Sequence, residues 1–179
     1  LDAALEKLLD WKDYAVEPKK QQLIEQMRAL LDSPESPEAL AIKISRLQDE
    51  WKGLSKGAQD QAQWEIFHQL SQTAYQPCKV FFEQQAKIRR ENLDRRIAMV
   101  QQLRNYVSSQ GWDTEAAQPF EARAVEAVFA AAIREWRGCV PVERSQNQSV
   151  QNDFDRMLDL IRSQINAHYE KNADIKRSL

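Results

Sequence analysis

The sequence predicts an all-α protein, in which elongated tandem three-helix units share one long helix. Three observations predict this fold class. The 179 residues include only 4 Gly and are dominated by Ala, Leu, Glu, Lys, Arg and Gln, which favour helix. No segment shows the alternation of a credible strand, and apolar residues instead recur three or four positions apart. A set of these apolar positions also occurs twice along the chain, as expected of repeated units.

Proline and glycine set the ends of the expected helices. Helices should begin at three prolines that fit a first helical turn, Pro18, Pro37 and Pro119. Helices should end near three glycines that can adopt a left-handed capping conformation, Gly53, Gly111 and Gly138. The expected helices are 2–15, 18–32, 37–52, 58–109, 119–137 and 148–177.

The longest expected helix, 58–109, contains Pro77. The proline ring removes the backbone bond to the carbonyl of Thr73, which predicts a bend near 73–77. The matching stretch later in the chain has the same apolar stripe and no proline. We therefore interpret Pro77 as a kink or brief interruption of one helix, and not as a domain boundary.

A tandem repeat organises the chain. Glu50-Trp51-Lys52-Gly53 recurs as Glu135-Trp136-Arg137-Gly138, an offset of 85, and downstream the offset is 87. In each copy the Trp helix should pair with the next apolar stripe as an antiparallel hairpin, and an upstream helix should complete the unit. The expected core residues of the repeat are Trp51, Phe67, Phe82, Trp136, Phe154 and Tyr169. The expected organisation is an N-terminal helix over 1–17 that could end a preceding repeat, a first repeat over 18–95 and a second over 96–179.

The repeat resembles a bacterial helical family, the domain of unknown function 349. The resemblance lies in Ile44-x-x-Leu47-Gln48-x-Glu50-Trp51-Lys52-Gly53-Leu54, followed by Trp64-x-x-Phe67 and Phe82. Features such as Trp11, Pro18-Lys19-Lys20 and Asn92-Leu93-x-x-Arg96 further resemble its gammaproteobacterial members. The resemblance covers about 18–95 and, in a degenerate second copy that lacks Gln-x-Glu, about 97–177. It implies tandem arrays in larger bacterial proteins and no established activity.

Charge and composition exclude several function classes. The net charge of −2 excludes the globally basic profile of a dedicated nucleic-acid binder, so any anion site must be local. No apolar run approaches the roughly 20 residues that span a bilayer, so we expect no membrane association and a cytoplasmic location. Cys78 and Cys139 lack the spacing of a zinc site or a disulfide framework, so we expect structural, reduced thiols.

The sequence contains no pattern that predicts catalysis. His68 and His168 are single, whereas a metal site needs three or four convergent ligands. There is no Gly-x-Ser-x-Gly elbow and no Gly-rich phosphate loop. We therefore expect that the chain is not an enzyme and has no metal, cofactor or small-molecule substrate.

One charged stretch departs from its helical context. Six basic residues and two acidic ones lie between Lys87 and Arg104, a net charge of +4. Arg89 falls within the apolar stripe of this helix and Arg96 at its edge, where an unpaired buried guanidinium would be costly. One interpretation is a solvated bridge between units. The other is an anion or acidic-protein site with exposed anchors, whose candidate residues are Arg89, Arg90, Arg96, Lys176 and Arg177.

Two functional hypotheses follow. The first is a non-enzymatic repeat segment that acts as a protein-interaction scaffold within a larger bacterial cytoplasmic protein. The second is binding of RNA or another polyanion through the Arg-rich face of the long helix, because a basic helix face can hold phosphates without reading bases.

Overall fold

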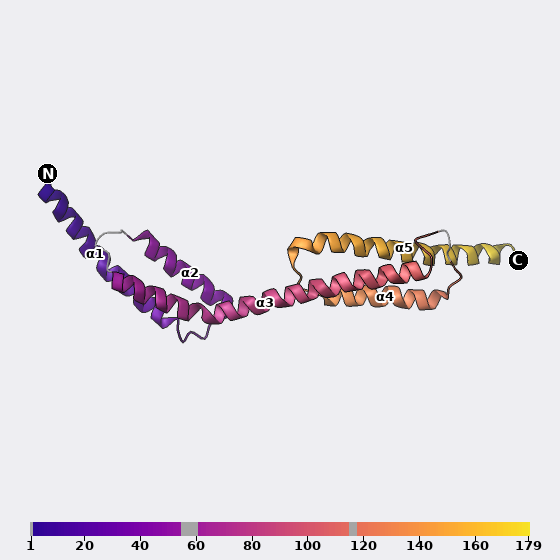
Figure 1. Ribbon diagram of the computed structural model, residues 1–179, viewed down its shortest axis with the longest axis horizontal. Coiled ribbons are helices and arrows are strands. Elements are labelled where there is room, and N and C mark those ends of the chain that lie inside the picture. The colour runs from indigo at the N-terminus through magenta and orange to yellow at the C-terminus, as the bar shows by residue number, and fades with distance from the viewer. Residues whose placement is uncertain (1, 55–60, 115–117) are drawn as a thin grey trace. The chain divides into compact units, whose positions relative to one another are not determined.

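Every regular element of the structure is an α-helix in the residues that it describes, which are 2–54, 61–114 and 118–179 (Figure 1). This computed structural model confirms the all-α fold class. Its helices are α1 (Asp2–Ala29), α2 (Pro37–Gly53), α3 (Gln61–Ser109), α4 (Ala122–Gly138) and α5 (Arg144–Arg177). The chain divides into two compact units, Leu1–Gln84 and Gln85–Leu179, and the division falls inside α3. We call them unit 1 and unit 2.

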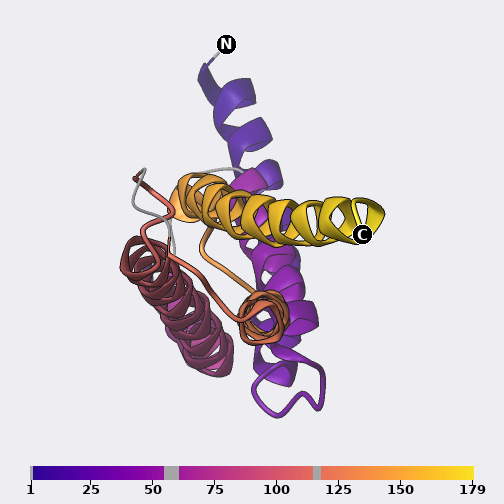
Figure 2. The same cartoon turned by 90° about the vertical axis from the view of Figure 1, so that its right-hand side faces the viewer.

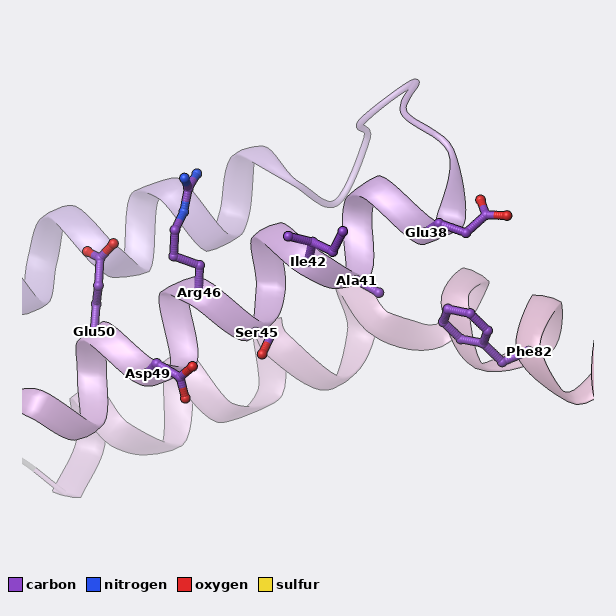
Figure 3. A pocket seen from close by; sticks show the side chains of 8 residues that line it. All are labelled: Glu38, Ala41, Ile42, Ser45, Arg46, Asp49, Glu50 and Phe82. Atoms are coloured by element: carbon purple, nitrogen blue, oxygen red, sulfur yellow. The ribbon is translucent and has the colours of Figure 1, made fainter.

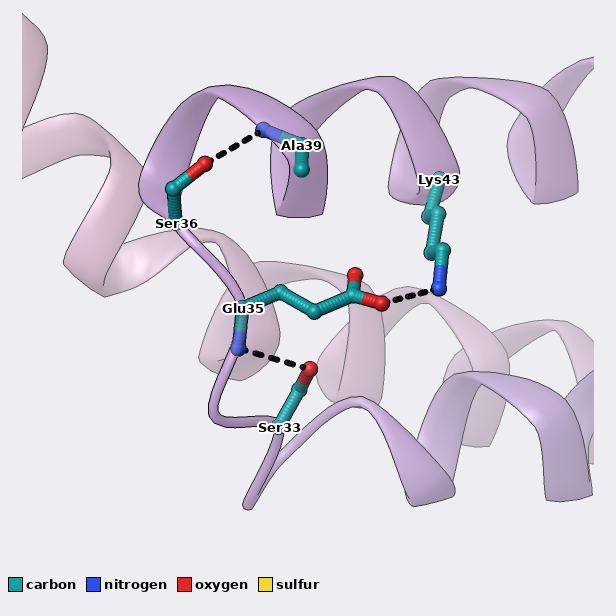
Figure 4. Close-up of polar contacts among 5 residues, drawn as sticks. All are labelled: Ser33, Glu35, Ser36, Ala39 and Lys43. Carbon is teal, nitrogen blue, oxygen red and sulfur yellow. Dashed lines mark hydrogen bonds and ion pairs between the residues drawn. The ribbon is translucent and has the colours of Figure 1, made fainter.

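Unit 1 is a three-helix unit made of α1, α2 and the first part of α3. All three helices supply its core, which contains Leu23, Ile24, Met27, Leu40, Ile44, Leu47, Phe67, Ala74 and Cys78. The start of α2 follows the predicted signal, with Pro37 in the first turn and the Ser36 hydroxyl accepting a hydrogen bond from the Ala39 amide at 3.3 Å (Figure 4). Lys43 pairs with Glu35 in the preceding connection, which fixes this end of the helix (Figure 4).

Unit 2 repeats this construction with the second part of α3, α4 and α5, which lie side by side in both views (Figures 1 and 2). Its core runs from α3 through α4 to α5 and includes Val100, Leu103, Val107, Val125, Trp136, Phe154, Leu158 and Ile161. The long helix α3, at 49 residues, therefore contributes to the cores of both units. The sequence predicted this sharing.

Two prolines lie inside helices. The expected helix start at Pro18 is wrong, because α1 is continuous from Asp2 to Ala29. A proline removes one backbone donor, and on an exposed stretch such as this one water can satisfy the freed carbonyl. α3 is likewise continuous through Pro77, so the interpretation as one helix is confirmed and the alternative of a brief interruption is wrong. Ala74 and Cys78, buried on either side of Pro77, hold the helix against the core.

The expected helix ends are partly corrected. Gly111 has a φ of 70° and ends α3 as predicted, whereas Gly53 and Gly138 remain helical. The Leu54 amide instead donates to the Trp51 carbonyl, and the Cys139 amide to the Trp136 carbonyl, both at 3.1 Å. These bonds tighten the last turn of each helix, which therefore needs no left-handed residue.

Three expected helix starts also need comment. α4 begins at Ala122 and not at Pro119, and α5 begins at Arg144 and not at 148. The residues before these helices, Glu121 and Glu143, have non-helical backbone angles. The expected start of the long helix at 58 lies outside the described residues. The expected repeat boundary at 95 stays a prediction.

Candidate interaction site: the Arg-rich stretch of α3

Arg96 is buried, with 6% of its surface exposed. Its guanidinium donates hydrogen bonds to Oδ1 of Asn147 at 2.8 Å and to the backbone carbonyl of Trp136 at 3.3 Å. The guanidinium carbon also lies 4.5 Å from the centroid of the Trp136 ring. The expectation that Arg96 is an exposed anchor is therefore wrong. α4 and α5 cover this face of α3, and acceptors from both helices replace water around the cation.

The buried guanidinium has no carboxylate partner among the described residues. Burial lowers the pKa of Arg96 from its ordinary value, since desolvation disfavours the charged form. The Trp136 carbonyl belongs to the last turn of α4, where the helix dipole is negative, so it offsets part of this cost. Nε of Arg96 has no hydrogen-bond partner. The Arg96 side chain thus holds the end of α4 against α3.

Arg96 belongs to a row of α3 residues that holds the connection from α4 to α5. The Arg89 carbonyl accepts a hydrogen bond from the Glu143 amide at 3.3 Å. The Asn92 side chain, which is buried, donates to the Pro141 carbonyl at 2.7 Å. With Arg96 bound to Asn147 in the first turn of α5, three successive points on α3 hold the loop and the start of α5. This part of the Arg-rich stretch is therefore neither a solvated bridge nor an open anion site.

The remaining basic candidates lie apart from this buried row. Arg89 is half-buried, whereas Arg90 and Arg95 are exposed. Lys176 and Arg177 are exposed at the end of α5, where Arg177 meets Asp174 at 4.0 Å. Glu143, which contacts Arg89, precedes α5, so Lys176 lies on the order of 50 Å further along that helix at 1.5 Å per residue. The structure does not bring the two candidate groups together.

The two repeat tryptophans make matching contacts. The rings of Trp51 and Phe67 stack with centroids 4.3 Å apart and planes at 10°, and those of Trp136 and Phe154 stack at 3.8 Å and 8°. The prediction that Phe67, Trp136 and Phe154 belong to the core is confirmed. Trp51 is half-buried and packs against the core of unit 1.

Phe82 and Tyr169 are wrongly predicted as core residues, because they are 37% and 48% exposed. Each lies next to the first turns of the antiparallel helix that precedes it. Phe82 lines a groove with Glu38 of α2, and the Tyr169 hydroxyl donates to Glu126 of α4 at 2.8 Å. The apolar stripes of α3 and α5 therefore continue to the open end of each hairpin, beyond the part that α2 or α4 covers. The hydrogen bond with Glu126 raises the pKa of Tyr169.

An open groove on unit 1 was missed by sequence reasoning (Figure 3). It has a volume of about 800 Å³ and is lined by Glu38, Ala41, Ile42, Ser45, Arg46, Asp49, Glu50 and Phe82. A signal existed in the sequence, since Ile42 is a large apolar residue outside the buried stripe of Leu40, Ile44 and Leu47. We call this the α2 groove.

Among the described residues, the cysteines and the other residue types that bind metals do not form a cluster. Cys78 and Cys139 are free and buried, and burial raises the pKa of the Cys78 thiol. Within the described ranges, no three His, Cys, Asp or Glu side chains converge to hold a metal ion. None of the helices, in the residues that could be searched, has the length and hydropathy to cross a membrane.

Comparison with known proteins gives one family match. A family model described as Domain of Unknown Function (DUF349) matches residues 62–145. No curated protein and no solved structure matches the chain significantly. The matched residues cover most of α3, all of α4 and the loop that follows α4, a different stretch from the expected first copy over 18–95. Residues 62–145, slightly less than half of the chain, are thus similar to the DUF349 domain.

Proposed function

We propose that this chain is a non-enzymatic helical repeat segment that acts as a protein-interaction scaffold within a larger bacterial cytoplasmic protein. The observation that carries the proposal is the exposure of large apolar side chains on helix faces of unit 1. Trp11 is 68% exposed, Ile42 71% and Val80 63%. Ile42 and Phe82, which is also exposed, line one groove, and contiguous exposed apolar surface often marks an interaction site, because covering it with a partner is favourable.

The proposal includes a second, degenerate repeat of the gammaproteobacterial type of the family. The equivalent Trp51–Phe67 and Trp136–Phe154 stacks support it, because both occur at the offsets of 85 and 87 found in the sequence. Each stack joins the two helices of a hairpin, and a third helix completes each core. Such units, repeated along a chain, typically present extended surfaces for partners.

The test is affinity purification of the tagged chain from bacterial cells, with and without nuclease. We expect a specific protein to remain bound after nuclease treatment and at raised salt concentration, because apolar contacts tolerate salt. Recovery of nucleic acid alone, lost on nuclease treatment, would contradict the scaffold.

The second candidate function is binding of RNA or another polyanion. One observation favours it: Arg90 and Arg95 are exposed on α3, and neither has an ion-pair partner among the described residues. Arg96 is not part of this proposal, since it is buried.

Titration of labelled polyuridylate across salt concentrations tests this candidate. Arg90→Glu with Arg95→Glu should weaken binding and flatten its salt dependence, while the melting temperature stays nearly unchanged. Binding that is independent of salt, or unaffected by this double substitution, would contradict it.

A further inference from the structure

The α2 groove presents one complete outer face of α2. The lining residues on this helix run from Glu38 to Glu50 and follow Glu38 by 3, 4, 7, 8, 11 and 12 positions. Residues with this spacing lie on one side of an α-helix. At 1.5 Å per residue this face is about 18 Å long. The opposite face of α2 is buried in the core of unit 1, so the groove face is free for a partner.

The groove combines apolar anchors with an acidic rim. Ile42 is exposed on the α2 side and Phe82 projects from α3 beside Glu38 (Figure 3). Three carboxylates line the groove, those of Glu38, Asp49 and Glu50, against one cation, Arg46. Asp49 also meets Lys52 at 3.9 Å, whereas Glu38 and Glu50 have no cationic partner among the described residues. The surface is therefore suited to a cationic partner.

The equivalent face of unit 2 lacks the large apolar anchor and the net negative charge of this groove. At the offset of 85, Ile42 corresponds to Ala127 and Glu38 to Arg123. Ala41 corresponds to Glu126, which accepts the hydrogen bond from Tyr169, the counterpart of Phe82. Glu50 keeps an acidic counterpart, Glu135, but Asp49 corresponds to Arg134. The large apolar anchor and the excess of carboxylates thus belong to unit 1, and the same molecule supplies a matched control surface.

We propose that the α2 groove binds a basic amphipathic helix of a partner protein. The partner's apolar stripe packs on Ile42 and Phe82, and flanking Lys or Arg side chains face Glu38 and Glu50. A partner helix of about three turns matches the 18 Å length of the face. In helix-in-groove recognition, the apolar side chains along one face of such a helix pack into the groove. The inference rests on the proposed scaffold function and names the chemistry of its partner.

The experiment measures binding of a fluorescein-labelled synthetic peptide to the purified chain by anisotropy. The peptide is an idealised helix of about 18 residues, with Leu along one face and Lys on both flanks. We expect it to bind more tightly than a matched peptide with Glu in place of Lys. Ile42→Glu should weaken binding at least tenfold, and Ala127→Glu should leave it unchanged.

Glu38→Gln with Glu50→Gln should weaken binding severalfold and reduce its salt dependence. Ile42, Glu38, Glu50 and Ala127 are exposed, so the melting temperatures of these variants should match that of the wild type. Equal binding of the Lys and Glu peptides, unchanged binding by Ile42→Glu, or equal loss from Ala127→Glu would each overturn the proposal. So would a dimer in sedimentation that Ile42→Glu dissociates, because a second copy would then fill the groove.

The failure of this site is distinguishable from failure of the scaffold function. If the chain with Ile42→Glu still recovers the same nuclease-resistant protein from cells, and the wild type does not bind the Lys peptide, the scaffold stands and the groove proposal fails. If no protein is recovered but the peptide results hold, the groove binds basic helices and the cellular scaffold role fails.

Discussion

The two units share an aromatic stack and differ in the cation beside it. In unit 1 the Lys20 ammonium lies 5.8 Å from the centroid of the Trp51 ring. In unit 2 the Arg96 guanidinium lies 4.5 Å from that of Trp136 and also makes two hydrogen bonds. The Trp136 indole is itself fixed, since its N–H donates to Gln151 at 3.0 Å. The aromatic stack is therefore common to both units. In unit 2 the planar guanidinium of Arg96 can form several hydrogen bonds at once, which allows α3, α4 and α5 to pack around Trp136.

The units also differ in one polar pair behind the stack. In unit 1 the Gln48 amide donates to the hydroxyl of buried Ser71 at 2.5 Å. The equivalent positions in unit 2 are Ile133 and Leu158, which pack in the apolar core. One hairpin geometry thus tolerates either a satisfied polar pair or an apolar contact.

The largest expected effect separates the two tryptophans. Trp136→Ala should lower the free energy of unfolding by about 3–5 kcal/mol, because a fully buried ring leaves a cavity. Trp51→Ala should cost about 2 kcal/mol, since the Trp51 ring is only half-buried and part of its contact is with solvent. Urea unfolding followed by circular dichroism measures both values. Equal losses for the two variants would contradict the difference in burial, and Trp→Phe at each position is the milder control.

The next effect separates the two cations. Arg96→Ala should lower the free energy of unfolding by about 2–3 kcal/mol, because it removes the donor to Asn147, one of the two donors to the Trp136 carbonyl and the packing of the side chain. Lys20→Ala should cost less than about 1 kcal/mol, since a lone cation near a ring contributes little. Thermal and urea unfolding of both variants check this order. A loss from Arg96→Ala no larger than that from Lys20→Ala would mean that α4 and α5 pack against α3 without help from the guanidinium.

A smaller effect tests the polar pair of unit 1. Gln48→Leu alone should cost about 1–2 kcal/mol, because the hydroxyl of Ser71 is left buried without its donor. Adding Ser71→Ala should recover most of that loss, since the pair then resembles the apolar contact of unit 2. A double-mutant cycle on urea unfolding gives the coupling energy. Strictly additive losses would show that the two side chains do not act as a pair.

The smallest effect concerns the exposed ends of the stripes. Tyr169→Phe gives unit 2 the residue that unit 1 has at the equivalent position and removes the bond to Glu126. The pKa of Tyr169 is raised in the folded state, so the contribution of this bond is present below the ordinary tyrosine pKa of about 10 and is lost as the pH rises through the higher folded value. At pH 8 the melting temperature of the wild type should be slightly higher than that of Tyr169→Phe. The difference should shrink as the pH is raised to 11. A difference that grows with pH would have the wrong sign.

Much of the fold followed from the sequence. Composition excluded strands, the spacing of Trp51, Phe67, Trp136 and Phe154 predicted both hairpins, and Pro37 predicted the start of α2. These features depend on contacts between near neighbours or on a period of 3.6, which a single sequence records directly. The DUF349 resemblance also came from such local spacing.

The tertiary structure alone decided how the charged and marginal positions are used. Periodicity placed Arg96 at the edge of the apolar stripe, but only the start of α5 and the end of α4 supply the acceptors that allow its burial. Phe82 continues the stripe in sequence, yet it is exposed because α2 covers α3 no further than its own first turn. Burial at the edge of a stripe depends on where neighbouring helices end and which acceptors they bring, and those are relations between distant segments that no local pattern encodes.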